Sequence, residues 1–267
     1  LVKSPATGVG EPFSQDEVRA AILLRANALA KGMSGIRLGV VRMLVELLNR
    51  GVTPVVPRKG SVGASGDLSP LAHISLVLLG GGEAWCDFGA RGPFPGAEAL
   101  RVAGLKPITL EAKEGLALTN GVQMTAGVLA LAVHEGSLLA KVADIVASLA
   151  GQALRSIPAA YDERLVEVRP HAGARDVAWN LRTLLSGSGY TTCPGEVRVQ
   201  DPYTIRCIPQ VHGAVRQAVE HVKSVVEVET GSATDNPLVF PDGHVVSGGN
   251  FHGQPLAVAA DYLGLAL

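Results

Sequence analysis

Lys59-Gly-Ser-Val-Gly-Ala-Ser-Gly-Asp-Leu-Ser-Pro-Leu-Ala-His73 is the most informative stretch of this 267-residue chain. Its three glycines predict an irregular loop, because glycine adopts backbone angles that other residues avoid. Ser69-Pro70 is typical of the N-cap and first turn of a helix, here expected over 71–79. The loop should therefore lie just ahead of a helix N-terminus, whose dipole favours negative charge nearby.

Within this loop, Ala64-Ser65-Gly66 could be converted into an electrophile. If the Gly66 nitrogen attacks the Ala64 carbonyl and two waters leave, the product is a five-membered methylidene-imidazolone whose exocyclic carbon comes from Ser65. Ordinary side chains supply nucleophiles, acids and bases but almost no electron sink, so such a ring would fill a real gap. The tripeptide alone is equally compatible with a flexible surface linker.

Other loop motifs do not fit the spacing. Counted from Gly60, a phosphate-binding loop requires glycine where Ser65 stands, and no lysine follows. A nucleophile elbow requires a second glycine where Asp67 stands. The seven histidines lack a metal-ligand spacing, so no catalytic metal is expected.

Four further blocks accompany the loop in order: Glu-Gly-Leu-Ala-Leu-Thr-Asn-Gly (114–121), Gln-Asp-Pro-Tyr-Thr-Ile-Arg-Cys (200–207), Asp-Asn-Pro-Leu-Val-Phe (235–240) and Ser-Gly-Gly-Asn-Phe-His (247–252). Together the five blocks resemble the aromatic amino acid lyase family over essentially the whole chain. They are more similar to its histidine ammonia-lyase branch than to the phenylalanine or tyrosine branches.

The resemblance implies elimination of ammonia from L-histidine to give urocanate, as a step of histidine catabolism. The cofactor would be the 4-methylidene-imidazol-5-one ring made from Ala64, Ser65 and Gly66, with no metal and no pyridoxal phosphate. Two alternatives stay open. One is a lyase or aminomutase of the same chemistry acting on another aromatic amino acid, and the other is an inactive remnant that oligomerises.

The resemblance also assigns residues around the ring. Arg206 is expected to hold the substrate carboxylate, because guanidinium can donate two parallel hydrogen bonds to it. Tyr203 is expected to be a catalytic residue and Gln200 a substrate-binding residue. Asn120 and Phe251 are expected to lie beside the ring and to belong to the substrate-binding residues. Asp67, Asp235 and His252 are expected to make structural hydrogen bonds instead.

Three departures from the family's pattern limit the transfer. Pro5 stands where the histidine branch has histidine. The counterparts of the family's tyrosine base and of a glutamate that contacts imidazole would lie before residue 1 and beyond residue 267. The chain is therefore interpreted as the central portion of a lyase, truncated or shortened by domain loss, with little turnover of L-histidine expected.

Composition agrees with a folded cytoplasmic protein. A net charge of −1 gives no reason to expect nucleic acid or an anionic membrane as a partner, and the expected partner is a small amino acid substrate. Three widely spaced cysteines predict neither a disulfide framework nor a zinc site. The apolar stretch 121–154 contains four charged or histidine positions and is interpreted as a buried bundle helix, not a membrane span.

The predicted fold is mainly α, with a mixed globular part carrying the loop (1–117) followed by a long-helix bundle (118–267) that is incomplete at its C-terminus. Ser14 and Glu17 form a capping-box pattern ahead of the first helix. Other helices are expected at 35–51, 109–156, 174–186, 209–230 and 254–267, with loops and short strands over 80–106 and a hairpin over 237–247. The long apolar helices predict a homo-oligomer, a tetramer by resemblance.

Overall fold

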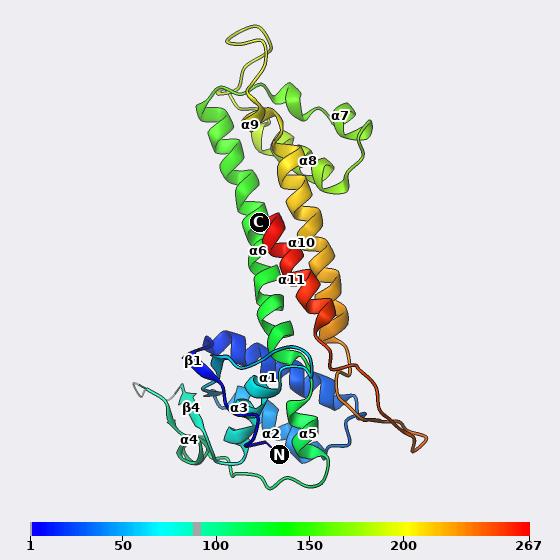
Figure 1. Cartoon of the computed structure of the whole chain (residues 1–267). Helices are drawn as coiled ribbons and strands as arrows, with labels where there is room; N and C mark the ends of the chain where they lie inside the picture. The colour runs from blue at the N-terminus through cyan, green and yellow to red at the C-terminus, as the bar shows by residue number, and fades with distance from the viewer. Residues whose placement is uncertain (1, 88–91) are drawn as a thin grey trace. The chain divides into compact units, whose positions relative to one another are not determined.

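The computed structural model describes residues 2–87 and 92–267. The chain forms two compact units, the first made of residues 1–131 and 225–258 and the second of residues 132–224 and 259–267. This division differs from the single boundary expected near residue 117, because the chain returns to the first unit at 225–258. Figure 1 follows the elements along the chain.

The first unit mixes helices with short strands. Its elements are β1 (Val9–Pro12), α1 (Gln15–Ala30), α2 (Leu38–Asn49), β2 (Val52–Pro54), β3 (Pro57–Lys59), α3 (Leu68–Leu78), β4 (Glu83–Cys86), β5 (Phe94–Pro95), α4 (Gly96–Val102), α5 (Glu114–Thr119), β6 (Leu238–Val239) and β7 (Val245–Val246). All its strand pairs are antiparallel, in the orders β1-β3, β2-β4-β5 and β6-β7. The β6-β7 pair is the predicted hairpin, with Leu238 opposite Val246.

Helix α1 begins as the sequence predicts. The Ser14 hydroxyl accepts a hydrogen bond from the Glu17 backbone N–H at 3.3 Å, and the Glu17 carboxylate accepts one from the Ser14 N–H at 2.7 Å. The helix then buries Val18, Ile22 and Leu29 in the core of the first unit, against apolar side chains of α2, α3 and α4. This core holds the helices that flank the glycine-rich loop.

Helix α3 starts earlier than expected. Asp67 occupies the N-cap position, and the first helical bond runs from the Leu71 N–H to the Asp67 carbonyl at 3.1 Å. Ser69 and Pro70 are buried within the first turn instead of preceding it. Proline is tolerated there because N–H groups of the first turn have no partner within the helix. The loop still lies directly ahead of a helix N-terminus.

The helical region expected at 109–156 is interrupted. Helix α5 ends at Thr119, and α6 (Gln123–Ala153) begins three residues after Asn120. Between them, Gly121 has a φ of 158°, and a Cβ there would lie 2.3 Å from the Arg25 guanidinium. The break thus comes from a close approach that the apolar pattern does not reveal. Helix α4 was also missed by the sequence analysis, which expected only loops and strands over 80–106.

The second unit is helical in all its named elements. It contains most of α6 and of α10 (Ile208–Thr230), the 3-10 helix η1 (Pro158–Tyr161), α7 (Glu163–Glu167), α8 (Ala172–Leu185), α9 (Tyr203–Arg206) and the end of α11 (Gln254–Ala266). Its core packs Tyr161 and Val166 against Val177 and Leu181 of α8 and Ile205 of α9. The prediction of a mainly α fold is therefore confirmed.

By length and composition, one stretch among the described residues, Glu114–Ala153, which contains α5, the break at Gly121 and α6, is apolar enough to cross a membrane. Of its most apolar window of 18 residues, 67% is buried inside the protein. The core helix of a soluble protein passes the same test, so this stretch is weak evidence for a membrane span.

The N-terminal end of α5 is held by an ion pair between an exposed arginine, Arg37, and a buried carboxylate, Glu114. The Glu114 carboxylate accepts hydrogen bonds from the Arg37 guanidinium, two of them at 2.7 Å, and from the Glu111 N–H at 2.7 Å. The side-chain hydrogen bond to Arg37 is the main cause that lowers the pKa of Glu114, to about 2. Burial of Glu114 acts in the opposite direction, but the hydrogen bonds outweigh it. Between about pH 2 and pH 4.5 this carboxylate is therefore ionised in the folded protein and protonated in the unfolded chain.

We expect the Glu114–Arg37 pair to make stability depend on pH in the acid range. Because the folded-state pKa is lowered from 4.5 to about 2, the contribution is complete above pH 4.5 and is lost as pH falls toward 2. Glu114→Gln removes it. Urea unfolding between pH 2 and 6 should show a difference between wild type and Glu114→Gln that shrinks on acidification. A constant difference would contradict the assignment.

Candidate active site

The glycine-rich loop passes very close to the break between α5 and α6. Gly66 has a φ of 76°, and a Cβ on it would lie 2.3 Å from the Gly121 carbonyl oxygen and 2.9 Å from the Gly121 nitrogen. The Asp67 N–H donates to that same oxygen at 2.6 Å. Only glycine fits at position 66, both for its backbone angle and for this contact.

Asp67 fixes the end of the loop. Its carboxylate is buried and accepts hydrogen bonds from the Ser61 hydroxyl at 2.8 Å, the Thr125 hydroxyl at 2.7 Å and the Thr125 N–H at 2.8 Å. Thr125 lies in the first turn of α6, where a negative charge is favoured by the helix dipole. Asp67 therefore has the structural hydrogen-bonding role that the sequence analysis expected, and it ties both sides of the loop to α6.

Asn120 contacts the tripeptide directly. Its side-chain amide donates to the Ser65 carbonyl oxygen at 2.8 Å, while the Asn120 side chain is otherwise buried. Ala64 and Ser65 are exposed, in contrast to Gly66 and Asp67, which are buried. The loop thus presents its outer residues to solvent and is held from its inner side.

The segment after the β6-β7 hairpin adjoins the same loop. The Gly253 N–H donates to the Gly63 carbonyl at 3.0 Å, and a Cβ on Gly253 would lie 3.5 Å from that oxygen. Phe251, two residues earlier, is partly buried. His252 accepts a hydrogen bond from the Gln254 N–H at 3.1 Å, which is a local structural contact.

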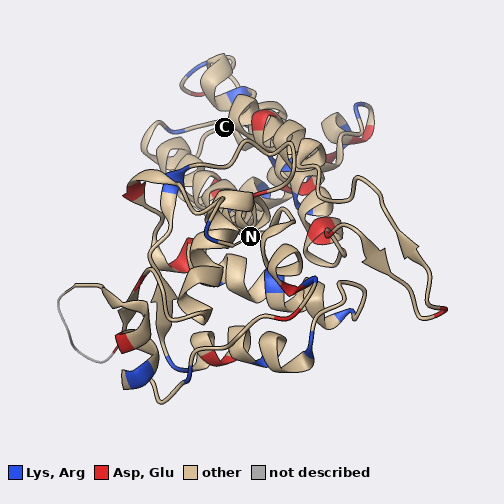
Figure 2. Ribbon diagram, turned by 60° about the horizontal axis from the view of Figure 1, so that its bottom comes forward, with Lys and Arg blue, Asp and Glu red and all other residues tan. Residues whose placement is uncertain are grey.

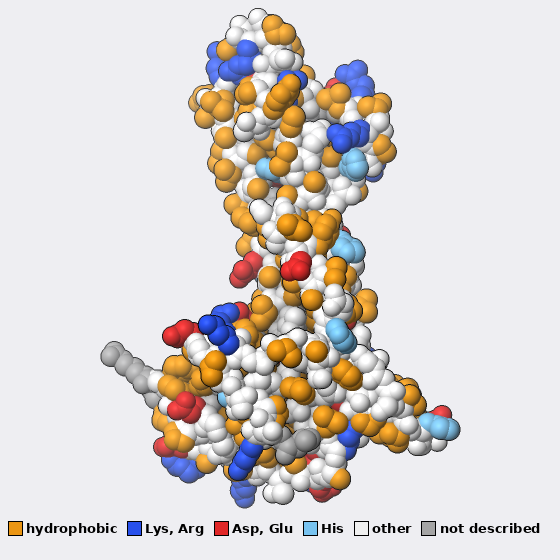
Figure 3. Space-filling model, in the orientation of Figure 1, with side chains coloured by type: hydrophobic (Ala, Val, Ile, Leu, Met, Phe, Trp, Pro, Cys, Tyr) orange, Lys and Arg blue, Asp and Glu red, His pale blue; other side chains and the backbone are white. Residues whose placement is uncertain are grey.

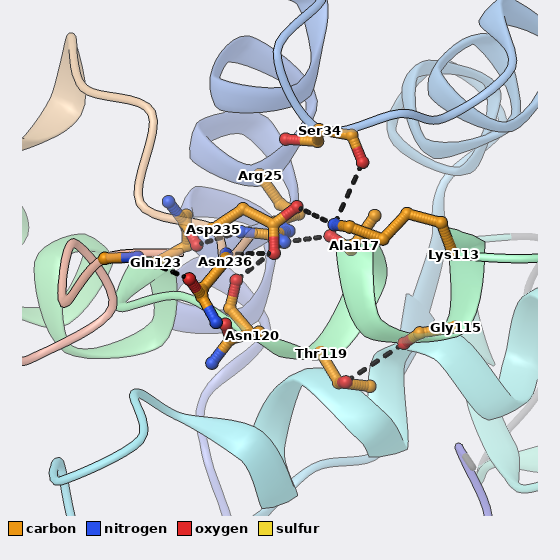
Figure 4. Close-up of polar contacts among 11 residues, drawn as sticks. Arg25, Ser34, Lys113, Gly115, Ala117, Thr119, Asn120, Gln123, Asp235 and Asn236 are labelled. Atoms are coloured by element: carbon orange, nitrogen blue, oxygen red, sulfur yellow. Dashed lines mark hydrogen bonds and ion pairs between the residues drawn. The ribbon is translucent and has the colours of Figure 1, made fainter. Parts of the chain in front are cut away.

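Behind the α5–α6 break lies a buried polar network drawn in Figure 4. Arg25 of α1 donates to the Gln123 side chain at 2.8 Å, to the Asn120 carbonyl at 2.8 Å and to the Ala117 carbonyl. The Gln123 amide in turn donates to the Thr234 hydroxyl at 2.6 Å. Burial lowers the pKa of Arg25 to about 10, with nearby Asp235 acting in the opposite direction, so the group remains charged at neutral pH.

A second buried pair belongs to this network. The Lys113 ammonium lies 2.7 Å from the Asp235 carboxylate and also donates to the Ser34 carbonyl at 3.1 Å. Asp235 additionally accepts from the Asn236 N–H at 2.6 Å. Asp235 is therefore structural, as expected, and it connects the hairpin segment to the start of α5.

The segment Gln200–Cys207 lies in the second unit. The Arg206 Nε donates to the Asp201 carbonyl at 2.6 Å, and its guanidinium stands 4.9 Å from the centre of the Tyr203 ring. Among the described residues, the two terminal Arg206 nitrogens have no hydrogen-bond partner. Tyr203 and Gln200 are exposed. Asp201 is buried and anchors the segment through the Ile157 N–H at 2.6 Å and Arg198 at 2.6 Å.

The predicted site residues therefore fall into two groups. Ala64, Ser65, Gly66 and Asn120 are brought together in the first unit, where Phe251 is also found, whereas Gln200, Tyr203 and Arg206 belong to the second. Among residues 2–87 and 92–267, no group of three or more His, Cys, Asp or Glu side chains could hold a metal ion. Figure 2 shows acidic and basic residues interspersed in that view, without separation into regions of one sign.

Four residues that support the loop were not predicted from the sequence: Arg25, Gly121, Gln123 and Thr125. A signal for Arg25 was present, since it follows Val18 and Ile22 at helical spacing and precedes Leu29 on the same buried face. A charged residue in an apolar stripe indicates a buried partner, because an unpaired buried charge is very costly. The partners, mainly carbonyl oxygens, carry no sequence signal of their own.

Comparison with known proteins places this geometry in a family. The model of the aromatic amino acid lyase family matches residues 1–267. Histidine ammonia-lyases of Alkaliphilus oremlandii and Symbiobacterium thermophilum are 54% and 55% identical over 268 residues, covering all of this chain. In both cases the match covers 52% of the relative, so the chain spans about half the length of these curated relatives.

Solved structures give the same result. Histidine ammonia-lyase from Trypanosoma cruzi superposes with a TM-score of 0.91 at 41% identity, over all of this chain and 50% of that one. Tyrosine aminomutase from Streptomyces globisporus gives 0.93 at 38% identity, over all of this chain and 53% of that one. The chain belongs to the aromatic amino acid lyase family, which confirms the resemblance seen in the sequence.

Proposed function

We propose that this chain is the central portion of an ammonia-lyase that converts L-histidine into urocanate and ammonia. The observation that carries the proposal is the contact of Asn120 with the Ser65 oxygen, in a loop where only glycine fits at position 66. The identity of 54% and 55% with proteins named histidine ammonia-lyase supports the substrate.

The residues present fit the self-made ring. Ring closure joins the Gly66 nitrogen to the Ala64 carbonyl carbon, and the backbone carbonyl of Ser65 becomes the ring carbonyl. This carbonyl oxygen already accepts a hydrogen bond from the Asn120 amide at 2.8 Å. Gly66 has no Cβ that would collide with Gly121 as its nitrogen becomes part of the ring. When formed, the ring would supply an electrophilic carbon, which ordinary side chains lack, for the amine or the aromatic ring of the substrate.

Asn120 has a role that follows from its contact. A fixed N–H donor stabilises negative charge on the oxygen that it touches, and the effect is large where water is excluded. Asn120 is buried, so its donor is oriented before any substrate arrives. The N-terminus of α3, directly after the loop, adds a favourable dipole for the same charge.

Arg206 is proposed to bind the substrate carboxylate. Its Nε is held by the Asp201 carbonyl, and its guanidinium lies over the Tyr203 ring, so the group is oriented. Both terminal nitrogens remain available, among the described residues, to a carboxylate in the two-bond geometry that guanidinium favours. Tyr203 and Gln200, on the same segment, are proposed to face the substrate with it.

The alternative to L-histidine as substrate is another aromatic amino acid, in an aminomutase of the same chemistry. The tyrosine aminomutase of Streptomyces globisporus and the phenylalanine aminomutase of Pantoea agglomerans superpose at TM-scores of 0.93 and 0.94. Their identities of 38% and 33% are lower than those of the histidine ammonia-lyases, so histidine is favoured. Pro5, which cannot donate a hydrogen bond to imidazole, is the feature that keeps the aminomutase alternative open.

We propose a cytoplasmic location and a place in histidine catabolism for the protein, both by analogy with the family. The 267 residues alone are expected to turn over little L-histidine, because no residue here replaces the family's tyrosine base convincingly. Urocanate formation is followed by its ultraviolet absorbance. Rapid turnover by these residues alone would show that one of them acts as the base.

The ring itself is tested by mass. We expect the intact mass of the purified protein to be two waters below the sequence mass, one from closure and one from the Ser65 hydroxyl. Ser65→Ala cannot lose the second water, so its mass should be short by one water or by none. Ser224→Ala, which removes an exposed serine hydroxyl of α10 and leaves the loop and its partners unchanged, is the control. An unmodified mass in well-folded wild-type protein would refute the electrophile.

Arg206→Ala is expected to weaken binding of urocanate by roughly tenfold to several hundredfold, since a lost bidentate charged contact costs a few kcal/mol. Titration calorimetry measures the affinity. Arg175→Ala removes an exposed positive charge from the same unit and should leave the affinity unchanged, which separates a specific contact from overall charge. Equal affinities for wild type and Arg206→Ala would remove Arg206 from the site.

We further propose a homo-oligomer, a tetramer by analogy with the family. Helix α6 exposes six large apolar side chains, which are Leu138, Leu139, Val142, Ile145, Val146 and Leu149. Hydrophobic side chains of the second unit reach its surface in Figure 3, an arrangement typical of faces that bury against another chain. Sedimentation should show an oligomer at micromolar concentration, and Leu139→Glu with Val146→Glu should weaken it. A stable wild-type monomer would contradict this.

A further inference from the structure

Gly121 is compressed between the Ala-Ser-Gly loop and the Arg25 side chain. On the loop side, its carbonyl accepts the Asp67 N–H at 2.6 Å and would lie 2.3 Å from a Cβ on Gly66. On the opposite side, a Cβ on Gly121 would lie 2.3 Å from Arg25 Nη1 and 2.4 Å from Gln123 Oε1. The Gly121 backbone therefore lies between Gly66 on one side and the hydrogen-bonded side chains of Arg25 and Gln123 on the other.

Arg25 also determines where Asn120 lies. Its guanidinium donates to the carbonyls of Ala117 and Asn120, at the end of α5, where carbonyl groups lack partners within the helix. A positive charge at a helix C-terminus is favoured by the dipole. The peptide that carries Asn120 is thus fixed by Arg25, and the Asn120 amide extends from it to the Ser65 oxygen.

From these contacts we infer that Arg25 is a positioning residue for closure of the ring at Ala64-Ser65-Gly66. The inference rests on the proposed function. Arg25 makes no hydrogen bond to the three residues. It acts through Gly121, which lies against Gly66, and through Asn120, which donates to the Ser65 carbonyl oxygen. Its effect should therefore appear in the rate of closure, beyond any effect on stability.

Closure balances without an external oxidant or reductant. The Gly66 nitrogen forms a bond to the Ala64 carbon, and the Ala64 oxygen leaves as water with the protons of the Gly66 and Ser65 N–H groups. The Ser65 hydroxyl leaves as the second water with the proton of the Ser65 Cα. The attack requires the Gly66 nitrogen to approach a carbonyl two residues earlier, so the support behind Gly66 directly affects the step.

Arg37 offers a matched control because it holds the other end of the same helix. Its guanidinium donates to the Glu114 carboxylate at 2.7 Å and to the Thr109 carbonyl at 2.8 Å. Neither contact involves Gly121 or Asn120. Arg37→Met thus removes a charged anchor from α5 without touching the support behind the loop.

The experiment compares wild type, Arg25→Met, Arg25→Lys and Arg37→Met by intact mass at intervals after synthesis, with thermal unfolding measured on the same samples. We expect Arg25→Met to lose its two waters about 10- to 100-fold more slowly than wild type, as displaced reacting groups typically do. Arg25→Lys should recover part of the rate, and Arg37→Met should close at the wild-type rate. Gln123→Met, a milder change to the same network, serves if Arg25→Met does not fold.

Each outcome is decisive. If wild type loses no water, the ring and the proposed function fail together, independently of Arg25. If wild type closes and Arg25→Met, or Gln123→Met in its place, closes equally fast, the positioning role is overturned while the proposed function stands. If Arg37→Met slows closure as much as Arg25→Met at equal loss of thermal stability, the effect is general destabilisation and the inference is likewise overturned.

Discussion

The close approach of Gly66 to Gly121 is the constraint on which the first unit depends. A Cβ on Gly66 would collide with the Gly121 backbone, and a Cβ on Gly121 would collide with the Arg25 side chain. The hydrogen bond from the Asp67 N–H to the Gly121 carbonyl joins the two segments. The consequences extend outward in both directions. The loop ends where α3 begins, and the helical region after residue 114 must break at Gly121 before α6 starts. A backbone contact thus decides where three helices begin or end.

Buried charges hold this contact in place because each is costly without its partner. Asp67 accepts hydrogen bonds from Ser61 within the loop and from Thr125 in the first turn of α6. Lys113 and Asp235 join the start of α5 to the hairpin segment in the same way. Such groups fix one arrangement, because moving any of these segments leaves a charge unpaired. They constrain the geometry of the unit more than they add to its stability.

The sequence predicts elements better than contacts. The capping box at Ser14, the hairpin and the helix expected at 209–230 follow from local patterns, and the structure confirms them, with the helix at Ile208–Thr230. The break at Gly121 and the early start of α3 were missed, because they depend on carbonyl groups and on first-turn N–H groups that every residue possesses. Asn120 was found through the family resemblance, whereas Arg25 could have been found as a charge on an apolar face.

The proposed chemistry would use groups from both units. The first unit holds the residues that can become an electrophile and the amide that can stabilise charge on it, but the guanidinium proposed for the carboxylate lies in the second. An electron sink without an anchor for the substrate gives little acceleration, because orientation supplies a large part of the rate in such reactions. On the proposed roles, lyase activity would require the guanidinium of Arg206 and the Ala-Ser-Gly loop to act on the same substrate molecule. The apolar residues exposed along α6 give a physical reason for copies to associate.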